Sequence, residues 1–393
     1  MRLLIVPLRY YPESGASPSR WTMLAENLVR KGCAVDVLTS VPNYPFARTF
    51  DGYRGRVFFC QRHNGCRIYR YWSYPTVSKN PLKRMANMFS SAFALRFFAV
   101  HVRRILSYDK VLIQSPPLPH AVSAMMLFKG IFRRKCVLNL SDIWPSTGVQ
   151  MGAIKKGSLS YIYMSWCEKY LVRNADMIIG QSEEILARVR ELPNKGKLFL
   201  FRNLPMREPV SEPKTKSQVL KICFAGMLGV AQDVLSVVKN IDFKSLNAEL
   251  HIVGKGFQYD EIYDYVNNHG DCNVFLHGLV EKDKMAGLYE QYDVALVPLK
   301  TNIRGAFPSK LYDVLPSGIP VLYSGCGEPA EFVEKNALGF VSAPMDFDAL
   351  KNNILKMAEM SCEEYKSMSR NCIDICRKMF NYDKQLEDFI DWL

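Results

Sequence analysis

The feature that most constrains this sequence is the alternation of short apolar runs with segments of helical periodicity. The runs cover residues 3–7, 35–38, 111–114, 137–140 and 177–180, then 222–225, 250–253, 274–277, 294–298 and 321–323. Such alternation is typical of parallel strands joined by crossover helices. Because several runs are apolar throughout, both faces of each sheet must be covered. The sequence therefore predicts an α/β chain with two facing, doubly wound, Rossmann-like domains.

The chain divides near its middle. Its 393 residues suffice for two or three domains. Residues 203–218 hold three prolines and several charges, and few of them could be buried. We therefore expect a first domain over residues 1–205, a linker over 206–218 and a second domain over 219–382. Residues 383–393 are expected to form a final helix that packs on either domain.

Charge is unevenly shared between the halves. Residues 1–206 carry 31 Lys and Arg against 11 Asp and Glu, a net of +20, and the remainder carries 20 against 27, or −7, which together give +13. A basic half suits nucleic acid or an anionic membrane, where each Lys or Arg contributes about 1 kcal/mol. Because no RNA-binding signature is present, we favour the anionic membrane surface and expect no nucleic acid partner.

Neither a leader nor a disulfide framework is indicated. The eleven cysteines are scattered and form no Cys-x-x-Cys pair, which favours packed, reduced thiols. No run reaches the roughly 18 apolar residues of a spanning helix, and the opening residues resemble a first strand more than a signal peptide. We therefore expect a cytoplasmic protein.

Two motifs in the second half suit a diphosphate. Gly226 and Gly229 stand in a turn that follows an apolar run and opens a helix, where backbone amides can approach a phosphate. A tight turn without any ligand explains these glycines equally well. The pattern Gly-x-Gly-x-x-Gly is missing, which argues against an NAD enzyme.

The second of these motifs covers residues 307–321. Pro308 suits the first turn of a helix, so Ser309 and Lys310 would lie where a phosphate is favoured. Asp313 would share the helix face of Lys310 and could accept hydrogen bonds from ribose hydroxyls. An ordinary capped helix is the alternative.

In the first half, polar residues follow two apolar runs. Gly15 and Ser17 precede a helix that begins near Pro18, and Arg20 could pair with a phosphate or with a surface carboxylate. Asp142 could hold or deprotonate a hydroxyl, and Trp144 offers an aromatic face to a sugar or lipid. The lone His120 is more often structural than catalytic.

One long segment suits a membrane surface. Residues 82–106 are apolar around much of the predicted helix and are framed by Lys83, Arg84, Arg103 and Arg104. Such a helix can lie in the headgroup region, and residues 125–135 repeat the blend. A core helix is the competing interpretation.

These motifs, in their order, resemble the GT-B glycosyltransferases of family 4. The segments that carry the resemblance are GMLGVAQ, HIVGKG, FLHGLVEKDKMAGLYEQYDVALVPL, FPSKLYDVLPSGIPV and GEPAEFVEKNALGF. The subgroup is similar to bacterial transferases of O-antigen and capsule assembly, such as the N-acetylfucosamine transferases. The chain departs from the family's Glu-x7-Glu motif, because Gly305 stands eight residues before Asp313. Met227 and Gln232 stand near positions where many members have Arg and Lys.

The resemblance implies retaining transfer of a sugar from a UDP-sugar to a polyprenyl-diphosphate-linked saccharide, at the inner face of the plasma membrane. Asp142 and Lys310 are the implied catalytic residues, and Gly15, Ser17, Arg20 and Trp144 the acceptor-binding ones. Donor binding is assigned to Gly226, Gly229, His277, Ser309, Lys310, Leu311, Asp313 and Glu331. No cofactor or metal is demanded, since Asp346-Phe347-Asp348 is better explained as a helix cap.

Two other functions remain open at this point. A nucleotide-sugar epimerase could share the two-domain fold and would need no acceptor. A non-catalytic protein that binds nucleotide at the membrane would account for the incomplete Glu-x7-Glu motif.

Overall fold

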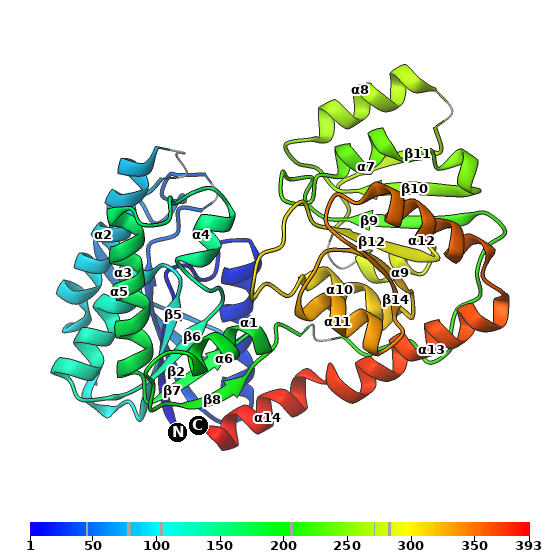
Figure 1. The fold of residues 1–393 in the computed structure, drawn as a ribbon. Helices are drawn as coiled ribbons and strands as arrows, with labels where there is room; N and C mark the ends of the chain where they lie inside the picture. Colours follow the sequence, from blue (N-terminus) through cyan, green and yellow to red (C-terminus); the bar gives the residue numbers. More distant parts are fainter. Residues whose placement is uncertain (45, 77–79, 103–104, 205–206, 271, 282–283) are drawn as a thin grey trace. The chain divides into compact units, whose positions relative to one another are not determined.

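A computed structural model describes residues 1–44, 46–76, 80–102, 105–204, 207–270, 272–281 and 284–393 (Figure 1). The chain forms two compact units. Unit 1 comprises Met1–Arg202 with Arg304–Ala306 and Trp392–Leu393, and unit 2 comprises Asn203–Ile303 and Phe307–Asp391. The first crossing between the units therefore falls three residues before the expected end of the first domain.

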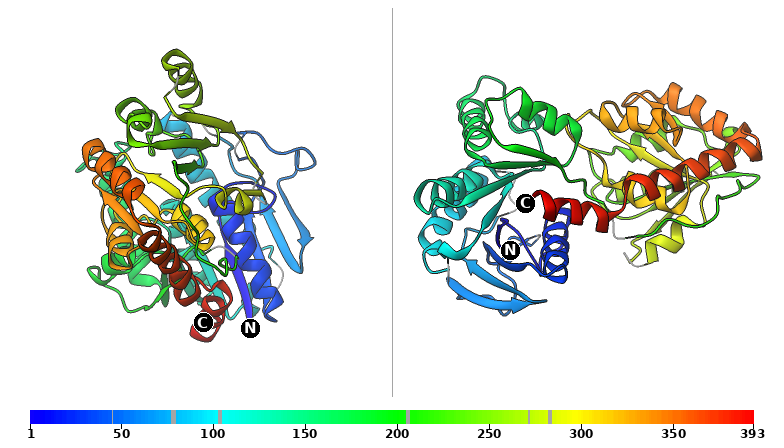
Figure 2. Two further views of the ribbon diagram at one scale, coloured as in Figure 1. Left: turned by 90° about the vertical axis from the view of Figure 1, so that its right-hand side faces the viewer. Right: turned by 90° about the horizontal axis from the view of Figure 1, so that it is seen from below.

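Unit 1 is built on an eight-stranded sheet in the order β3-β4-β2-β1-β5-β6-β7-β8. All neighbours are parallel except β3 and β4, a hairpin at the sheet edge (Figure 2). The strands are β1 (Arg2–Val6), β2 (Ala34–Ser40), β3 (Phe58–His63), β4 (Cys66–Tyr71), β5 (Lys110–Ser115), β6 (Lys135–Leu140), β7 (Met177–Gly180) and β8 (Lys197–Leu200).

Helices cover both faces of this sheet. α2, α3 and α5 pack on one face and form the larger core with it, while α1 packs on the other (Figure 1). The helices of unit 1 are α1 (Ala16–Arg30), α2 (Pro81–Ala99), α3 (Leu118–Met125), α4 (Ser146–Gln150), α5 (Leu159–Asn174) and α6 (Glu183–Arg190), with a 3-10 turn at Ile105–Ser107 and a π-helical segment at Met126–Ile131.

Unit 2 is built on a fully parallel six-stranded sheet in the order β11-β10-β9-β12-β13-β14. This is the 3-2-1-4-5-6 order of a dinucleotide-binding fold. The strands are β9 (Leu220–Ala225), β10 (Ala248–Val253), β11 (Val274–Gly278), β12 (Val294–Pro298), β13 (Val321–Ser324) and β14 (Gly339–Ser342).

The helices of unit 2 also lie on both faces of their sheet. α7, α8 and α12 bury apolar side chains against one face, and α10 and α11 pack on the other. The helices are α7 (Val234–Asn240), α8 (Tyr259–His269), α9 (Met285–Tyr289), α10 (Ser309–Val314), α11 (Glu328–Lys335), α12 (Phe347–Glu359), α13 (Cys362–Met379) and α14 (Tyr382–Trp392), with 3-10 turns at Lys244–Leu246 and Leu315–Ser317.

The predicted fold class is confirmed, and each apolar run forms a strand. Four further strands, β3, β4, β8 and β14, were not predicted. The hairpin could have been predicted from its Asn-Gly pair. Asn64 and Gly65 form the turn between β3 and β4 with φ values of 44° and 82°. An Asn-Gly pair between alternating residues is a strong signal for a two-residue hairpin turn.

Residues 125–135 are divided between the core and the surface. Met125, Leu127 and Phe128 are buried in the core of unit 1, while Gly130, Ile131, Arg133 and Lys135 are exposed, so the interfacial role expected for this segment stays a prediction. The helix expected over residues 82–106 forms as α2 and ends at Ala99, and Arg103 and Arg104 lie outside the described residues. No described helix is long and apolar enough to cross a membrane.

Part of the expected linker is bonded to unit 2. Val210 N donates to Pro316 O, and Lys214 Nζ donates to the carbonyls of Glu290 and Tyr292 at 2.6 Å each. The prolines give this segment no regular element of its own, yet its polar groups find partners on unit 2.

Candidate functional site

In unit 2 the strand order reverses between β9 and β12, whose neighbours lie on opposite sides. Open parallel sheets bind ligands beyond the carboxyl ends of their strands at this reversal. The glycine turn at 226–229 follows β9, and α10 follows β12 through the segment 299–308. The two motifs with phosphate-binding character are therefore carried by the two strands at the reversal point.

The turns after β9, β10 and β11 are packed closely against one another. Gly226 N donates to Val253 O at 2.8 Å, and Gly254 N donates to Gly278 O at 2.6 Å. Gly226 has a φ of 144° and Gly254 a φ of 141°, and a Cβ on Gly254 would collide with the carbonyl of Gly226. Glycine is required at Gly254 because the two backbones approach too closely for a side chain, and both positive φ values favour glycine.

Lys310 lies over the first of these turns. Its Nζ is 4.9 Å from the centre of the Phe224 ring, and a Cβ added to Gly226 would collide with that Nζ. Burial lowers the pKa of Lys310, and the charge of Asp313 acts in the opposite direction. No described residue forms an ion pair with this ammonium group. A partly buried cation beside exposed backbone is a suitable partner for a phosphate.

The other predicted residues of α10 differ in their surroundings. Ser309 and Asp313 are exposed, and Asp313 acts electrostatically on both Lys310 and Tyr289. The Leu311 side chain is fully buried, and its amide donates to Pro308 O at 3.1 Å. Leu311 therefore packs the helix against unit 2, while the Ser309 and Asp313 side chains are exposed and the Lys310 side chain is partly buried.

The position that breaks the Glu-x7-Glu motif has a structural role. Gly305 belongs to unit 1, is buried and adopts a φ of 85°. Its N donates to Glu184 Oε2 at 2.5 Å, and its carbonyl accepts from Ser182 Oγ at 2.8 Å. A Cβ here would come within 2.9 Å of Ile143. A glutamate cannot occupy this position in this chain without moving those neighbours.

Two predicted donor residues lie at other strand ends of unit 2. His277 near the end of β11 is exposed and joins a chain in which its Nε2 is 3.0 Å from His251 Nδ1, while His251 Nε2 is 3.1 Å from Glu249 Oε2. Glu331 is exposed in the first turn of α11, which follows β13. Gly229 stands further along the turn of Gly226.

In unit 1 the first polar loop is tied to a neighbouring strand. Gln114 near the end of β5 accepts from Leu8 N at 3.0 Å and donates to Ser17 Oγ at 2.8 Å. Gly15 caps α1 with a φ of 125°. Sequence reasoning identified Gly15 and Ser17 but missed Gln114, although a polar residue at the end of an apolar strand was a usable signal.

Arg20 on α1 reaches the end of β6. Its Nη2 donates to Asn139 Oδ1 at 2.7 Å, its Nη1 lies 3.4 Å from Ser141 Oγ, and the side chain is buried. The structure therefore brings Arg20 beside the segment that carries Asp142. The sequence analysis also missed Asn139, which, like Gln114, is a polar residue near the end of an apolar strand.

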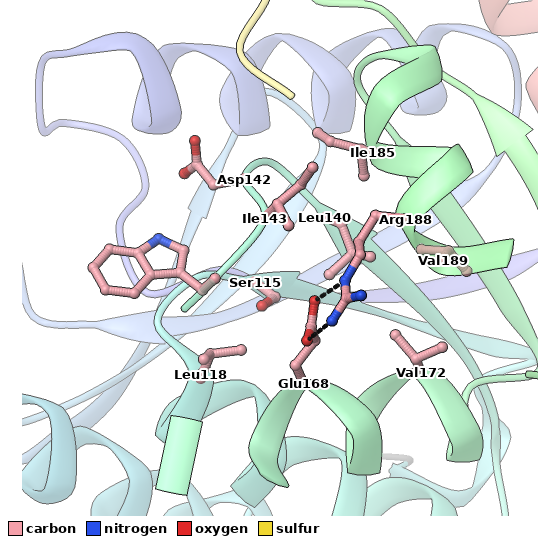
Figure 3. Close-up of a pocket in the computed structure, with 11 residues that line it drawn as sticks. Ser115, Leu118, Leu140, Asp142, Ile143, Glu168, Val172, Ile185, Arg188 and Val189 are labelled. Carbon is pink, nitrogen blue, oxygen red and sulfur yellow. Dashed lines mark hydrogen bonds and ion pairs between the residues drawn. The ribbon is translucent and has the colours of Figure 1, made fainter. Parts of the chain in front are cut away.

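Asp142 and Trp144 line a pocket of unit 1 together with Ser115, Glu168 and Arg188 (Figure 3). Arg188 holds Glu168 through two bonds of 3.2 and 3.0 Å, and Figure 3 shows the Asp142 carboxylate directed away from this pair. Burial raises the pKa of Asp142. A carboxylate that is costly to ionise is a stronger base than one in water, which suits contact with a hydroxyl.

Trp144 is less open than predicted. A Cβ on Gly148 would lie 2.6 Å from its ring, so one part of the indole is covered by α4. The ring is half-buried against the core of unit 1. Only the uncovered part of the indole can contact a ligand.

Two further predictions concern groups outside the site. Burial lowers the pKa of His120 to about 4, and its Nδ1 is 3.5 Å from Tyr71 OH, which fits a neutral structural histidine. Asp346 caps α12 by accepting from Ala349 N at 2.9 Å, so the helix-cap prediction is confirmed. Among the described residues no group of His, Cys, Asp and Glu could hold a metal ion.

Comparison with known families assigns both units. Residues 15–202 match the family described as glycosyl transferase 4-like domain, and residues 220–360 match the family described as glycosyl transferases group 1. This chain carries both domains of a GT-B glycosyltransferase. The glycosyltransferase matches these families over most of each unit, including the glycine turn, α10 and the Asp142 segment.

Individual relatives of the glycosyltransferase are distant. An uncharacterized glycosyltransferase of Methanocaldococcus jannaschii, MJ1069, is 21% identical over 99% of this chain and 97% of its own length. A putative colanic acid biosynthesis glycosyl transferase of Escherichia coli, WcaI, is 22% identical over 81% of this chain and 82% of its own length. HepE of Anabaena, solved in complex with UDP and glucose, superimposes with a TM-score of 0.65 at 14% identity over 100% of both chains.

Proposed function

We propose that this glycosyltransferase moves a sugar, with retention at the anomeric carbon, from a UDP-sugar to a polyprenyl-diphosphate-linked saccharide. The product would serve O-antigen, capsule or exopolysaccharide assembly, and an N-acetylated deoxyamino sugar fits the subgroup that the sequence resembles. The observation that carries the proposal is the position of the Lys310 ammonium, which forms no ion pair with any described residue, over the Gly226 turn at the reversal point of a dinucleotide-binding sheet.

The donor site follows from this arrangement. A diphosphate beside the turn would meet backbone amides and Lys310, and Asp313 on the same helix face could accept from ribose hydroxyls. Gly229, Ser309, His277 and Glu331 complete the proposed donor contacts. A UDP donor is supported by HepE, which has the same fold and was solved with UDP.

Charge stabilisation would supply most of the catalysis. As the bond to the anomeric carbon lengthens, negative charge develops on the departing diphosphate and the sugar gains oxocarbenium character. Lys310 would hold that charge. Because desolvation already penalises this ammonium, a phosphate oxygen that accepts its hydrogen bonds offsets a cost present in the free protein.

The acceptor is assigned to unit 1. We propose that Asp142 holds or deprotonates the acceptor hydroxyl, since burial makes its carboxylate more basic than one in water. Gly15, Ser17 and Arg20 would contact the acceptor's phosphates, and Trp144 its sugar or lipid. A polysaccharide-assembly role is supported by WcaI, which is named for colanic acid biosynthesis. A lipid-linked acceptor would place the enzyme on the inner face of the plasma membrane.

Calorimetry with UDP tests the donor site. Lys310→Ala should weaken UDP binding by about 10- to 100-fold, the range expected for one charge-assisted hydrogen bond. Lys335→Ala, at the exposed end of α11, is the matched control and should bind like the parent protein. Unchanged affinity in Lys310→Ala, or no UDP uptake by the parent protein, would contradict the proposed site.

Product analysis tests the reaction class. Incubation with a panel of UDP-sugars and a short prenyl-diphosphate saccharide, read by mass spectrometry, should yield an acceptor extended by one sugar. Conversion of the donor sugar without any acceptor would support an epimerase instead. UDP binding without either product would support a non-catalytic nucleotide-binding protein.

A further inference from the structure

One face of α2 is an apolar stripe open to solvent. Its exposed side chains are spaced three or four residues apart, and Phe93 and Phe97 are 74% and 59% exposed. The opposite face, with Ser91, Ala94 and Leu95, is buried in the core of unit 1. The stripe consists of Leu82, Met85, Phe89, Phe93, Phe97 and Val100.

A second stripe lies on α5, for which no membrane role was predicted. Leu159 is 86% exposed and Ile162 is 58% exposed, and Tyr163 and Trp166 complete this face. The rings of Tyr163 and Trp166 stack with centroids 6.2 Å apart. Cys167 and Leu171, on the other face, are buried.

The two stripes form one surface, called here the α2–α5 face. Phe89 and Tyr163 have ring centroids 6.1 Å apart, so the exposed faces meet near the middle of α2 and the second turn of α5. Arg96 on α2 acts electrostatically on Tyr170 on α5, and both residues lie two helical turns beyond the first pair. Because both contacts join residues 74 positions apart in the chain, the helices run in the same direction.

The charged residues of the two helices are basic apart from one. α2 carries Lys83, Arg84 and Arg96, and α5 carries Lys169 and Arg173 beside the single acidic residue Glu168. Lys155 and Lys156 directly precede α5, Lys83 lies in the first turn of α2, and all three are exposed. The one acidic residue of α5, Glu168, is buried and paired with Arg188.

We infer that the α2–α5 face inserts into the headgroup region of an anionic lipid bilayer, with Ile162 and Trp166 of α5 among the inserted side chains. The inference rests on the proposed function in that it names the surface by which the enzyme meets its lipid-linked acceptor. Aromatic and aliphatic side chains rimmed by cations are the composition of interfacial helices on anionic lipid. A protein partner that matched this rim would have to be strongly acidic and apolar at once.

Vesicle flotation with the full chain tests the inference. Vesicles of 70% phosphatidylcholine and 30% phosphatidylglycerol should bind the parent protein, while Ile162→Glu/Trp166→Glu should reduce its partition coefficient by at least about tenfold. Tyr263→Glu is the matched control, because Tyr263 is an exposed aromatic residue on α8 of unit 2. This control should partition like the parent protein.

A second pair of variants tests the lysines beside the α2–α5 face. Lys155→Glu/Lys156→Glu should lose at least about tenfold in binding to anionic vesicles, since each cation near such a surface contributes roughly one step of five- to tenfold. Lys351→Glu/Lys356→Glu, on exposed positions of α12, is the control and should retain binding. The fluorescence blue shift that vesicles induce should be largely lost in Trp166→Phe, which keeps an apolar ring.

Three results would overturn the inference. The first two are a parent protein that does not bind anionic vesicles and an Ile162→Glu/Trp166→Glu variant that binds them as well as the parent does. The third is a parent protein that is dimeric in light scattering and becomes monomeric in this double variant. UDP calorimetry on the same variants separates the two proposals. A variant that no longer binds vesicles but still binds UDP shows that the donor site is intact. A parent protein that binds UDP but not vesicles contradicts only the proposed membrane surface.

Discussion

At the scale of single residues, two glycines make opposite contributions to the proposed chemistry. Gly226 has no side chain, and this leaves room over the β9 turn for the Lys310 ammonium, which we propose binds the diphosphate. Gly305 is enclosed by Ile143 and Ile185 and bonded to Glu184, so its missing side chain serves packing. The incomplete Glu-x7-Glu motif is therefore a consequence of how unit 1 holds residues 304–306.

Gly226→Ala should damage the donor site. A Cβ at a φ of 144° is strained and displaces Lys310, so we expect the free energy of unfolding to fall by about 1–3 kcal/mol and UDP affinity to fall by about tenfold or more. Gly270→Ala is the control, because Gly270 has a φ of 60° but open space around it. That variant should lose about 1 kcal/mol and bind UDP normally. Equal UDP affinity in both variants would argue against the site.

Asp142→Asn should change stability and activity in opposite directions. Burial raises the pKa of Asp142, so ionisation costs more in the folded protein than in the unfolded chain. Below the unfolded pKa, near 3.9, both states are protonated and the variant should match the parent. As pH rises through the folded pKa the parent loses stability, so the variant should unfold at higher denaturant concentration at pH 7. Sugar transfer should fall by about 100-fold.

At the scale of elements, α5 is fixed to its surroundings by one buried ion pair. Glu168 on α5 is held by Arg188 on α6 through two nitrogen atoms, and the Glu168 side chain is almost fully buried. The rest of α5 offers its apolar stripe to solvent. Glu168, Cys167 and Leu171 lie on the buried face of α5. Their burial determines that the apolar stripe on the other face points to solvent.

Arg188→Ala should lower the free energy of unfolding by about 3–5 kcal/mol, because it leaves a buried carboxylate without its partner. Adding Glu168→Gln removes that charge and should restore most of the loss. Urea unfolding followed by circular dichroism measures both variants. A double variant as unstable as the single one would show that packing, and not the unpaired charge, is responsible.

At the scale of the whole molecule, charge is divided between the units, and we propose that the ligands are divided in the same way. The cationic sequence and the proposed acceptor and lipid contacts belong to unit 1, and the proposed UDP contacts belong to unit 2. This division predicts that each ligand stabilises its own unit first.

Hydrogen exchange with and without UDP tests the division. At UDP concentrations 100-fold above Kd, binding stabilises the site by about 2.7 kcal/mol, so amides of residues 220–229 and 307–314 should exchange more slowly. Amides of the loop at residues 8–17 should change little. Protection centred on the loop of residues 8–17 would move the donor site to unit 1.

Much of the fold could be predicted because its signals are local. Each apolar run formed a strand, since a buried strand must be apolar along its own length. β8 and β14 escaped because they are short and only half-buried, with residues such as Lys197 and Gly339 that break the apolar pattern. For residues 125–135 the sequence could not tell which apolar side chains are buried, as Phe128 is, and which are exposed, as Ile131 is, because a core helix and an interfacial helix have similar composition.

The sequence by itself determined that this chain forms two doubly wound α/β units and which residues follow each strand, because strand periodicity and turn chemistry are properties of short segments. Only the tertiary structure decided which strands are neighbours, and hence that Lys310 lies over Gly226 and Arg20 beside Asn139. It also decided that α5 presents an apolar face to solvent while residues 125–128 do not. Those outcomes depend on packing between segments far apart in the chain, where long-range burial and hydrogen bonding outweigh local pattern.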